Sequence, residues 1–198
     1  MRSTNNKVSV RDRILETASD LFYRQGYRAT GINQIIAESG VAKASFYDHF
    51  PSKEDLLYAY AVKTSDFEIN DVRADVMARE TPRERFFGPL RILTPWFEAT
   101  GYRGCPFQIL VSEAPPEAVK VREVSQAHRE KARNFFKELI RDLMIAEPDL
   151  RHMDIETVAD IYLVLFEGAM ATAVAYQDAW PVARCEQALE RLLSTYRT

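Results

Sequence analysis

The chain has 198 residues, of which 46% are hydrophobic and 28% charged, with a formal net charge of −3. This composition supports a folded core in one domain or two small ones and excludes a disordered or fibrous chain. No apolar run approaches the roughly 18 residues that span a bilayer, and the first ten residues lack the apolar stretch of a secretory signal. We therefore expect a cytoplasmic protein without a membrane partner.

The two cysteines show no CxxC or Cys/His spacing, so neither a disulfide framework nor a metal site or other cofactor is expected. Charge is distributed unevenly. Residues 1–53 contain eight Lys or Arg and five Asp or Glu, a net +3, which leaves −6 for the remainder. A basic N-terminal end on an acidic body is compatible with an anionic partner at that end. Seven glycines and few alternating β-branched runs predict an all-α fold.

Helix start and stop signals predict four helices in the first part of the chain, over residues 10–26, 30–39, 42–50 and 53 to about 77. Ser9 and Ser52 are each followed three residues later by an aspartate, which is typical of an N-terminal cap. Gly40 provides a sharp turn between the two short helices. Helices joined in this way predict a helix-turn-helix.

The third helix has two different faces. Phe46 and Phe50 fall on the face that should pack inward, whereas Lys43, Ala44, Tyr47 and Asp48 fall mostly outward. A lysine can meet a phosphate or a guanine edge, a tyrosine hydroxyl can donate to a phosphate, and a small alanine lets the backbone approach bases. Lys53, at the positive end of the fourth helix, adds a natural phosphate site.

The sequence GYRATGINQIIAESGVAKASFYDHFPSKEDLL, residues 26–57, resembles the DNA-binding signature of the TetR-type transcriptional regulators. The resemblance implies phosphate contacts from Thr30, Tyr47, His49 and Lys53, and base or groove contacts from Lys43, Ala44 and Gln34. Two positions depart from the family pattern. Ala42 stands where the family often has a capping serine, and Asp48 places a negative charge near DNA.

The resemblance also implies a division of the chain. Residues 1–57 would form the helix-turn-helix DNA-binding domain, with the fourth helix continuing as a connector to about residue 77. Residues 58–198 would form a helical domain that binds an effector and makes a homodimer. The body contains no GxSxG, no phosphate-cradling glycine loop and no HExxH, and its histidines lie far apart, so we do not expect an enzyme.

The sequence from Thr81 and Pro82 onward predicts a helix with two interior prolines, Pro89 and Pro95, which remove backbone hydrogen bonds and bend a helix. A bent helix that carries aromatic side chains leaves room for a small molecule, and the TetR resemblance favours an effector pocket there. An ordinary aromatic core is the alternative for each residue. The predicted pocket residues are Phe86, Leu90, Trp96, Phe97, Phe107, Gln108, Phe136, Tyr162 and Phe166.

Cys105 precedes Pro106 at a predicted helix N-terminus, where the helix dipole lowers a thiol pKa. Two interpretations stay open: a redox or electrophile sensor, or a small residue that fits a tight helix start. The last two predicted helices, capped by Asp154 and opened by Trp180 and Pro181, are candidates for self-association. The residues assigned to this dimer interface are Gly168, Thr172, Leu189 and Leu193.

Together these patterns predict a DNA-binding regulator, a repressor that a small molecule releases from a palindromic double-stranded operator. Two alternatives stay open. One is a constitutive DNA-binding protein without an effector, and the other is a helical enzyme or small-molecule carrier whose N-terminal region only resembles a regulator.

Overall fold

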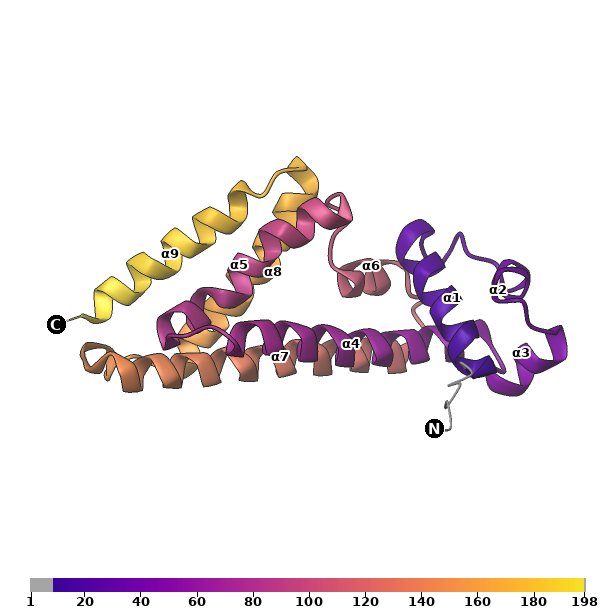
Figure 1. The fold of residues 1–198 in the computed structure, drawn as a ribbon, viewed down its shortest axis with the longest axis horizontal. Coiled ribbons are helices and arrows are strands. Elements are labelled where there is room, and N and C mark those ends of the chain that lie inside the picture. Colours follow the sequence, from indigo (N-terminus) through magenta and orange to yellow (C-terminus); the bar gives the residue numbers. More distant parts are fainter. Residues whose placement is uncertain (1–8, 198) are drawn as a thin grey trace, which may run out of the picture. The chain divides into compact units, whose positions relative to one another are not determined.

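In the computed structural model, residues 9–197 are described, apart from the side chain of residue 67. Arg2 and Lys7, which contribute to the basic N-terminal end, lie outside the described residues. The described chain is helical and contains no strand, which confirms the all-α prediction (Figure 1). Its elements are α1 (Val10–Gln25), α2 (Ile32–Ser39), α3 (Lys43–His49), α4 (Lys53–Met77), α5 (Pro82–Thr100), α6 (Pro106–Glu113), α7 (Val119–Ala146), the 3-10 helix η1 (Pro148–Leu150), α8 (Ile155–Tyr176) and α9 (Trp180–Tyr196).

The described residues divide into two compact units. The N-terminal unit comprises residues 9–65 together with Pro106–Ser125, and the C-terminal unit comprises Asp66–Cys105 together with residues 126–197. Helices α4 and α7 contribute residues to both units. The segment that contains α6 therefore groups with the helix-turn-helix region, although it lies far away in the sequence.

Helix starts follow the predicted caps. The Ser9 hydroxyl accepts the Asp12 N–H at 3.0 Å, and the Ser52 hydroxyl accepts the Asp55 N–H at 3.0 Å. These bonds satisfy backbone donors that a helix leaves unpaired at its first turn. The Asp154 side chain caps α8 in the same way. The capping predictions at α1, α4 and α8 are confirmed.

The boundaries of the helix-turn-helix differ from the prediction by one or two residues. Helix α2 begins at Ile32 rather than at Thr30, because Gly31 has an extended backbone and serves as the N-cap residue. Helix α3 ends at His49, and Phe50 is extended, with its N–H still bonded to the Phe46 carbonyl. Gly40 has φ of 64° and ends α2 in the left-handed region, where glycine is favoured.

Each unit has its own apolar core. In the N-terminal unit, α1 contributes Ile14 and Ala18, α2 contributes Ile35, and α3 contributes Phe46; all four are fully buried. The inward orientation predicted for Phe46 and Phe50 is confirmed. Burial of such side chains is the main force that holds a short helix in place, because a helix of seven residues is unstable alone.

Helix α8 corrects one expectation from the sequence. Over Ile155–Tyr176 it is, by length and composition, apolar enough to cross a membrane, and about a third of its apolar stretch is buried within the protein. One such helix is weak evidence for a membrane span, because core helices of soluble proteins meet the same criterion. Its Glu156 and Asp160 pair with Arg133 of α7, which ties α8 into the C-terminal unit.

Candidate nucleic-acid interface

Helix α3 presents a polar outer face. Lys43, Ala44, Tyr47 and His49 are all exposed, and the Tyr47 side chain is 42% accessible. Directly behind them, Phe46 is fully buried. The period of the helix separates Lys43, Ala44 and Tyr47 from Phe46, so these three side chains point away from the core. His49, two residues after Tyr47, is exposed on another side at the end of α3.

Ring contacts lie beneath the exposed face of α3. The Tyr47 ring meets the Phe46 ring edge to face, with centroids 5.3 Å apart. The Arg11 guanidinium, from α1, lies over the Phe50 ring at 5.2 Å from its centroid. Arg11 was not among the predicted site residues. The only signal for it in the sequence was the basic character of the N-terminal end.

The structure corrects the phosphate contact predicted for Thr30. Its side chain is 0% exposed, so in this structure it does not reach a phosphate. The Thr30 hydroxyl donates to the Gly26 carbonyl at 2.7 Å and accepts from Gln25 Nε2 at 3.2 Å. Both bonds hold the turn between α1 and α2, and this turn fixes the start of the helix-turn-helix.

Gln34 is partly exposed on α2. Its amide exchanges hydrogen bonds with Gln25 of α1 at 2.9 and 3.3 Å, and it donates to Glu38 at 2.8 Å. A base contact from Gln34 would therefore compete with an existing pair of amide bonds.

Lys53 also has a partner within the protein. Its ammonium donates to the Tyr27 carbonyl at 2.7 Å and lies 4.1 Å from the centroid of the Tyr27 ring. Burial lowers the pKa of Lys53, and the negative charge of Glu113 opposes part of that effect. Burial, with a smaller contribution from Glu54, raises the pKa of Tyr27. An ammonium carries three donors, so a phosphate contact from Lys53 would be made beside its bond to the Tyr27 carbonyl.

The predicted pocket residues are split between the two units. Phe107 and Gln108 belong to the N-terminal unit, and the other seven belong to the C-terminal unit. Five of those seven are buried rather than arranged around an open space: Phe86, Leu90, Phe97, Phe136 and Tyr162. Trp96 and Phe166 are partly exposed.

The buried rings are in direct contact. Tyr162 stacks on Phe136 at 4.3 Å between centroids and meets Phe86 edge to face at 5.3 Å, while its hydroxyl donates to the Phe86 carbonyl at 2.6 Å. Phe166 meets Phe136 at 5.7 Å. Burial raises the pKa of Tyr162 well above its ordinary value, so the hydroxyl stays a donor. The sequence identified this aromatic cluster but not its close packing.

Two titratable groups in the C-terminal unit were missed by the sequence analysis. Burial, followed by the nearby charge of Glu167, raises the pKa of Glu68 to about 8. Burial, followed by Arg129 and Lys131, lowers the pKa of His128 to about 4. His128 Nε2 lies 3.6 Å from Glu68 Oε2. At pH 7 the pair is therefore mainly uncharged, with the proton on the carboxyl group.

Cys105 is 5% exposed. A sensor needs a thiolate that an oxidant can reach, so burial favours the interpretation of Cys105 as a small residue at a tight helix start. Cys185, on α9, is also buried, and burial raises the pKa of its thiol. Among the described residues, no group of three or more His, Cys, Asp or Glu side chains is arranged to hold a metal ion.

The two predicted dimer residues of α8 lie on its exposed side, whereas the two of α9 lie on its buried side. Gly168 is exposed and Thr172 partly exposed, but Leu189 is 0% and Leu193 1% exposed within a single chain. Both leucines are core residues of the C-terminal unit, so in this structure they do not lie on a surface that a second copy could meet. The apolar face of α9 packs against α5 and α8 instead.

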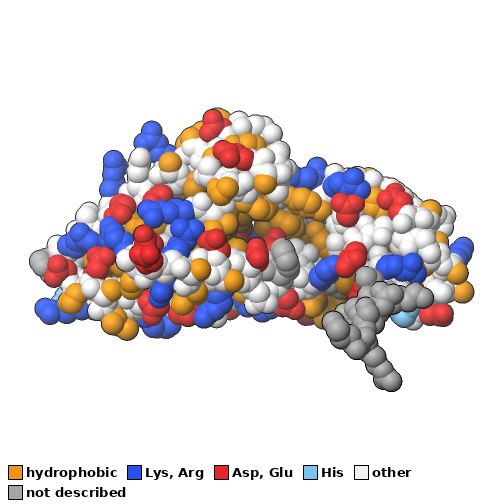
Figure 2. Space-filling model, in the orientation of Figure 1, with side chains coloured by type: hydrophobic (Ala, Val, Ile, Leu, Met, Phe, Trp, Pro, Cys, Tyr) orange, Lys and Arg blue, Asp and Glu red, His pale blue; other side chains and the backbone are white. Residues whose placement is uncertain are grey.

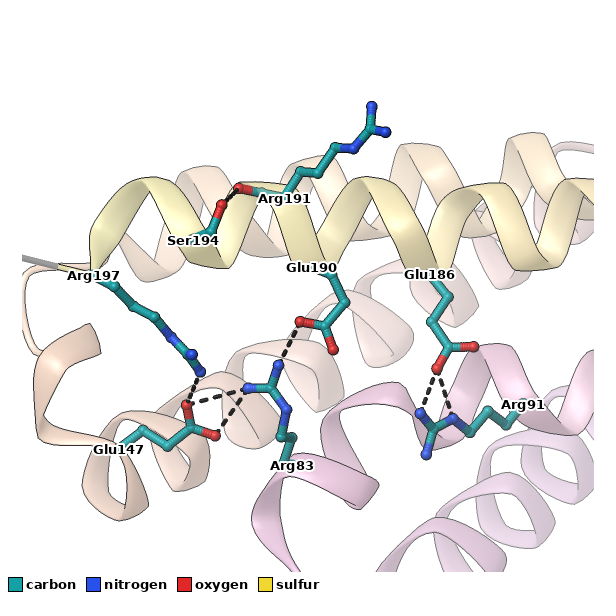
Figure 3. Close-up of polar contacts among 8 residues, drawn as sticks. All are labelled: Arg83, Arg91, Glu147, Glu186, Glu190, Arg191, Ser194 and Arg197. Atoms are coloured by element: carbon teal, nitrogen blue, oxygen red, sulfur yellow. Dashed lines mark hydrogen bonds and ion pairs between the residues drawn. The ribbon is translucent and has the colours of Figure 1, made fainter.

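Ion pairs reinforce this packing of α9 (Figure 3). Arg83 of α5 bonds to both oxygens of Glu147 at 3.0 and 3.2 Å and pairs with Glu190 of α9. Arg91 of α5 pairs with Glu186, one turn earlier on α9. Figure 2 shows basic and acidic side chains intermixed on one face of the C-terminal unit.

The fold and this exposed face define the class of protein: a helix-turn-helix protein with a recognition helix available to DNA. The family model for bacterial regulatory proteins of the tetR family matches residues 14–60. The HTH-type transcriptional regulator LmrA of Bacillus subtilis (strain 168) is 31% identical over 186 residues, which cover 92% of this chain and 96% of LmrA.

Solved structures agree with this assignment. SCO4454, a TetR-family transcriptional regulator from Streptomyces coelicolor, aligns with a TM-score of 0.77 and 26% identity over 96% of each chain. A protein from Saccharomonospora viridis in complex with choline shares the fold, with a TM-score of 0.74 and 23% identity over 93% of this chain and 95% of that one. The chain belongs to the TetR family of transcriptional regulators. It is a DNA-binding regulator and not an enzyme.

Proposed function

We propose that the protein is a homodimeric repressor that a small molecule releases from a near-palindromic operator. The observation that carries this proposal is the outer face of α3, where Lys43, Ala44 and Tyr47 are exposed together, with His49 exposed at the end of the helix. Two copies of α3, one from each subunit, would enter successive major grooves on one side of the duplex.

Each residue of this face has a role in the proposal. Lys43 meets a guanine edge or a phosphate, Tyr47 and His49 donate to phosphates, and Ala44 lets the helix approach the bases. Phosphate contacts fix the position of the protein on the duplex, whereas Lys43 and the close approach at Ala44 contribute sequence preference. The exposed carboxylate of Asp48 disfavours phosphates placed against that side of α3.

For the dimer, we propose the outer face of α8 and the adjoining surface of α9. Val164, Gly168, Ala171 and Ala175 form an exposed stripe along α8, and Val164 is 71% accessible. A groove beside this stripe is lined by Val164, Gly168, Thr172, Trp180 and Arg184, among others. Small side chains allow close approach of helices, and an exposed apolar stripe favours association. In a two-fold dimer the same stripe serves both subunits.

For the effector, we propose the aromatic cluster of the C-terminal unit. Phe86, Tyr162, Phe136 and Phe166 form a continuous series of ring contacts, and Phe166 is the member that is partly exposed. A ligand that enters beside Phe166 and binds one arrangement of these rings better than another would shift the population toward a conformer with wrongly spaced recognition helices. The choline complex of the Saccharomonospora viridis protein is a precedent for a small molecule on this fold.

The test begins with selection of duplexes from a random library by the full-length protein. We expect a near-palindromic site, a dimer in sedimentation, and affinity that falls steeply with salt. A thermal-shift screen should then find a stabilising small molecule that releases the selected duplex. Recovery of a site but no stabilising compound would support a constitutive DNA-binding protein, and failure to select any duplex would support a helical carrier.

A further inference from the structure

A residue of α6 makes contact with the turn between α1 and α2, and both belong to the N-terminal unit. Glu113, the last residue of α6, accepts the Arg28 backbone N–H on Oε2 at 3.2 Å. The Arg28 guanidinium Nε donates to the Glu113 carbonyl, also at 3.2 Å. One residue of α6 therefore holds both the backbone and the side chain of Arg28, 85 positions away in the sequence.

Gly26 provides the space for this contact. Its φ is +94°, which an L residue rarely adopts, and a Cβ built on it would lie 2.5 Å from Oε1 and 2.7 Å from Oε2 of Glu113. A side chain at position 26 would occupy the place of the carboxylate. The positive φ requires glycine at the bend that ends α1, and the missing side chain leaves room for the Glu113 carboxylate.

The turn over residues 26–28 also bonds to residues of the helix-turn-helix and of α4. On one side, the Gly26 carbonyl accepts the Thr30 hydroxyl, which in turn accepts from Gln25, the partner of Gln34 on α2. On the other side, the Tyr27 carbonyl accepts the Lys53 ammonium. The Glu113 carboxylate is also close enough to Lys53 to favour its charged form, as the pKa of Lys53 indicates.

We propose that Glu113 is a positioning residue for DNA recognition. By accepting the Arg28 N–H, its carboxylate fixes the turn over residues 26–28, and this turn sets the placement of α2 on α1 and the anchor of Lys53. Glu113 acts through the turn and makes no contact with DNA itself. The proposal depends on the DNA-binding role of the family and is independent of the proposed effector.

The first experiment compares Glu113→Ala with Glu113→Gln, which keeps an acceptor oxygen. The probes are a duplex selected in vitro by the unmodified protein and a random duplex, titrated by fluorescence anisotropy at several salt concentrations. We expect Glu113→Ala to weaken the affinity for the selected duplex about three- to tenfold, which is the usual effect of losing one such hydrogen bond. Removal of a negative charge by itself strengthens DNA binding, so binding of the random duplex should not weaken.

Two variants complete the comparison. Glu113→Gln should stay within about twofold of the parent, as an amide oxygen still accepts the bond. Glu117→Ala is the matched control, because Glu117 is an exposed acid of the same unit four residues later, and it should also stay within about twofold. Unchanged or stronger binding of the selected duplex by Glu113→Ala, or equal losses in the alanine and glutamine variants, would overturn the proposal.

A second measurement keeps the proposal testable if the alanine variant is poorly folded. Gly26→Ala suffers the same backbone strain in the parent and in Glu113→Ala, so a double-mutant cycle isolates the clash with the carboxylate. We expect Gly26→Ala to lower the urea midpoint more in the parent than in Glu113→Ala. Amide hydrogen exchange at Arg28 should be slow in the parent and in Glu113→Gln. Equal effects of Gly26→Ala in both backgrounds, or a rapidly exchanging Arg28 amide in the parent, would overturn the proposal.

Discussion

Helices α3 and α9 both have an amphipathic sequence, yet the structure uses their faces differently. In α3 the predicted contact residues Lys43 and Tyr47 lie on the exposed side, and His49 is exposed at the end of the helix. In α9 the predicted contact residues Leu189 and Leu193 lie on the buried side. Polar residues on a recognition helix have no reason to turn inward, whereas an apolar stripe can meet its own chain or a second copy equally well. The sequence therefore predicted the exposed side of α3 correctly, but it did not decide whether the apolar side of α9 packs within its own chain.

The largest expected effect tests the buried side of α9. Leu189→Arg places a charge without a partner in the core of the C-terminal unit, which we expect to cost at least about 3 kcal/mol of unfolding free energy. This is a large share of the stability of a typical domain. Urea unfolding followed by circular dichroism should show a strongly destabilised protein rather than a folded monomer.

The control for this variant is Gly168→Arg on the exposed face of α8. A Cβ at position 168 would have no atom within 4 Å, so the substitution should leave the fold intact. In the proposed dimer it should separate the subunits, which sedimentation would show as a folded monomer. A folded Leu189→Arg protein with the urea midpoint of the parent would show that this face is not core.

Sequence information was sufficient where one short segment decides the structure. The caps at Ser9 and Ser52 and the turn at Gly40 involve residues within a few positions, and all three form as predicted. The inward face of α3 follows from the same helical period. Contacts between distant segments were not predictable, because Glu113 and Arg28 show no pattern that relates them.

Thr30 and the aromatic cluster show a second limit. A threonine before a helix can donate to a phosphate or to its own backbone, and the position of the Gly26 carbonyl, 2.7 Å away, decides between the two. Likewise, the prolines of α5 suggested room for a ligand, but the stacking of Tyr162 on Phe136 fills that region with rings. In both cases the residue type was informative and the packing partner was not.

The next largest effect tests the exposed side of α3. We expect Lys43→Ala and Tyr47→Ala to weaken operator binding by about 1–3 kcal/mol each without changing the unfolding midpoint. If Lys43 contacts a phosphate, the slope of log affinity against log salt should also fall by about one. Gel shifts over a salt series would measure both quantities.

Two lysines of α4 sharpen this prediction. Lys63→Ala removes the same charge about 15 Å along α4 from Lys53 and should change affinity little. Lys53→Ala should have a smaller effect than Lys43→Ala, since Lys53 already bonds to the Tyr27 carbonyl. A Lys63→Ala protein as weak as Lys43→Ala would mean that only total charge matters.

A smaller effect concerns the pH dependence of stability in the C-terminal unit. The pKa of Glu68 rises from 4.5 to about 8 on folding, so between these values the folded state binds more protons and stability falls as pH rises. The pKa of His128 falls from 6.5 to about 4, so stability rises with pH between 4 and 6.5. The two effects oppose each other below pH 6.5, and only that of Glu68 remains above it.

We therefore expect the unfolding free energy to fall by about 1–2 kcal/mol between pH 6.5 and 8, within the limit of about 1.4 kcal/mol per pH unit for one group. Urea unfolding at half-unit steps of pH would measure it. Glu68→Gln cannot ionise, so its stability should be nearly constant over this range. The same decline in the parent and in Glu68→Gln would assign the effect to another group.

The smallest expected effect returns to α9 and to the ion pairs that hold its inner face on α5. Arg83 bridges Glu147 and Glu190 and is about one third exposed, whereas the side chain of Arg91, paired with Glu186, is 42% exposed. Exposed pairs contribute little, because water and salt screen them. We expect Arg91→Gln to cost about 0.3 kcal/mol and Arg83→Gln about 1 kcal/mol of unfolding free energy. A double-mutant cycle with Glu186→Gln and Glu190→Gln in low and in 1 M salt would separate the pair energies from the loss of each side chain. An effect of Arg91→Gln close to that of Leu189→Arg would mean that charge pairs, rather than the buried leucines, hold α9 on the core.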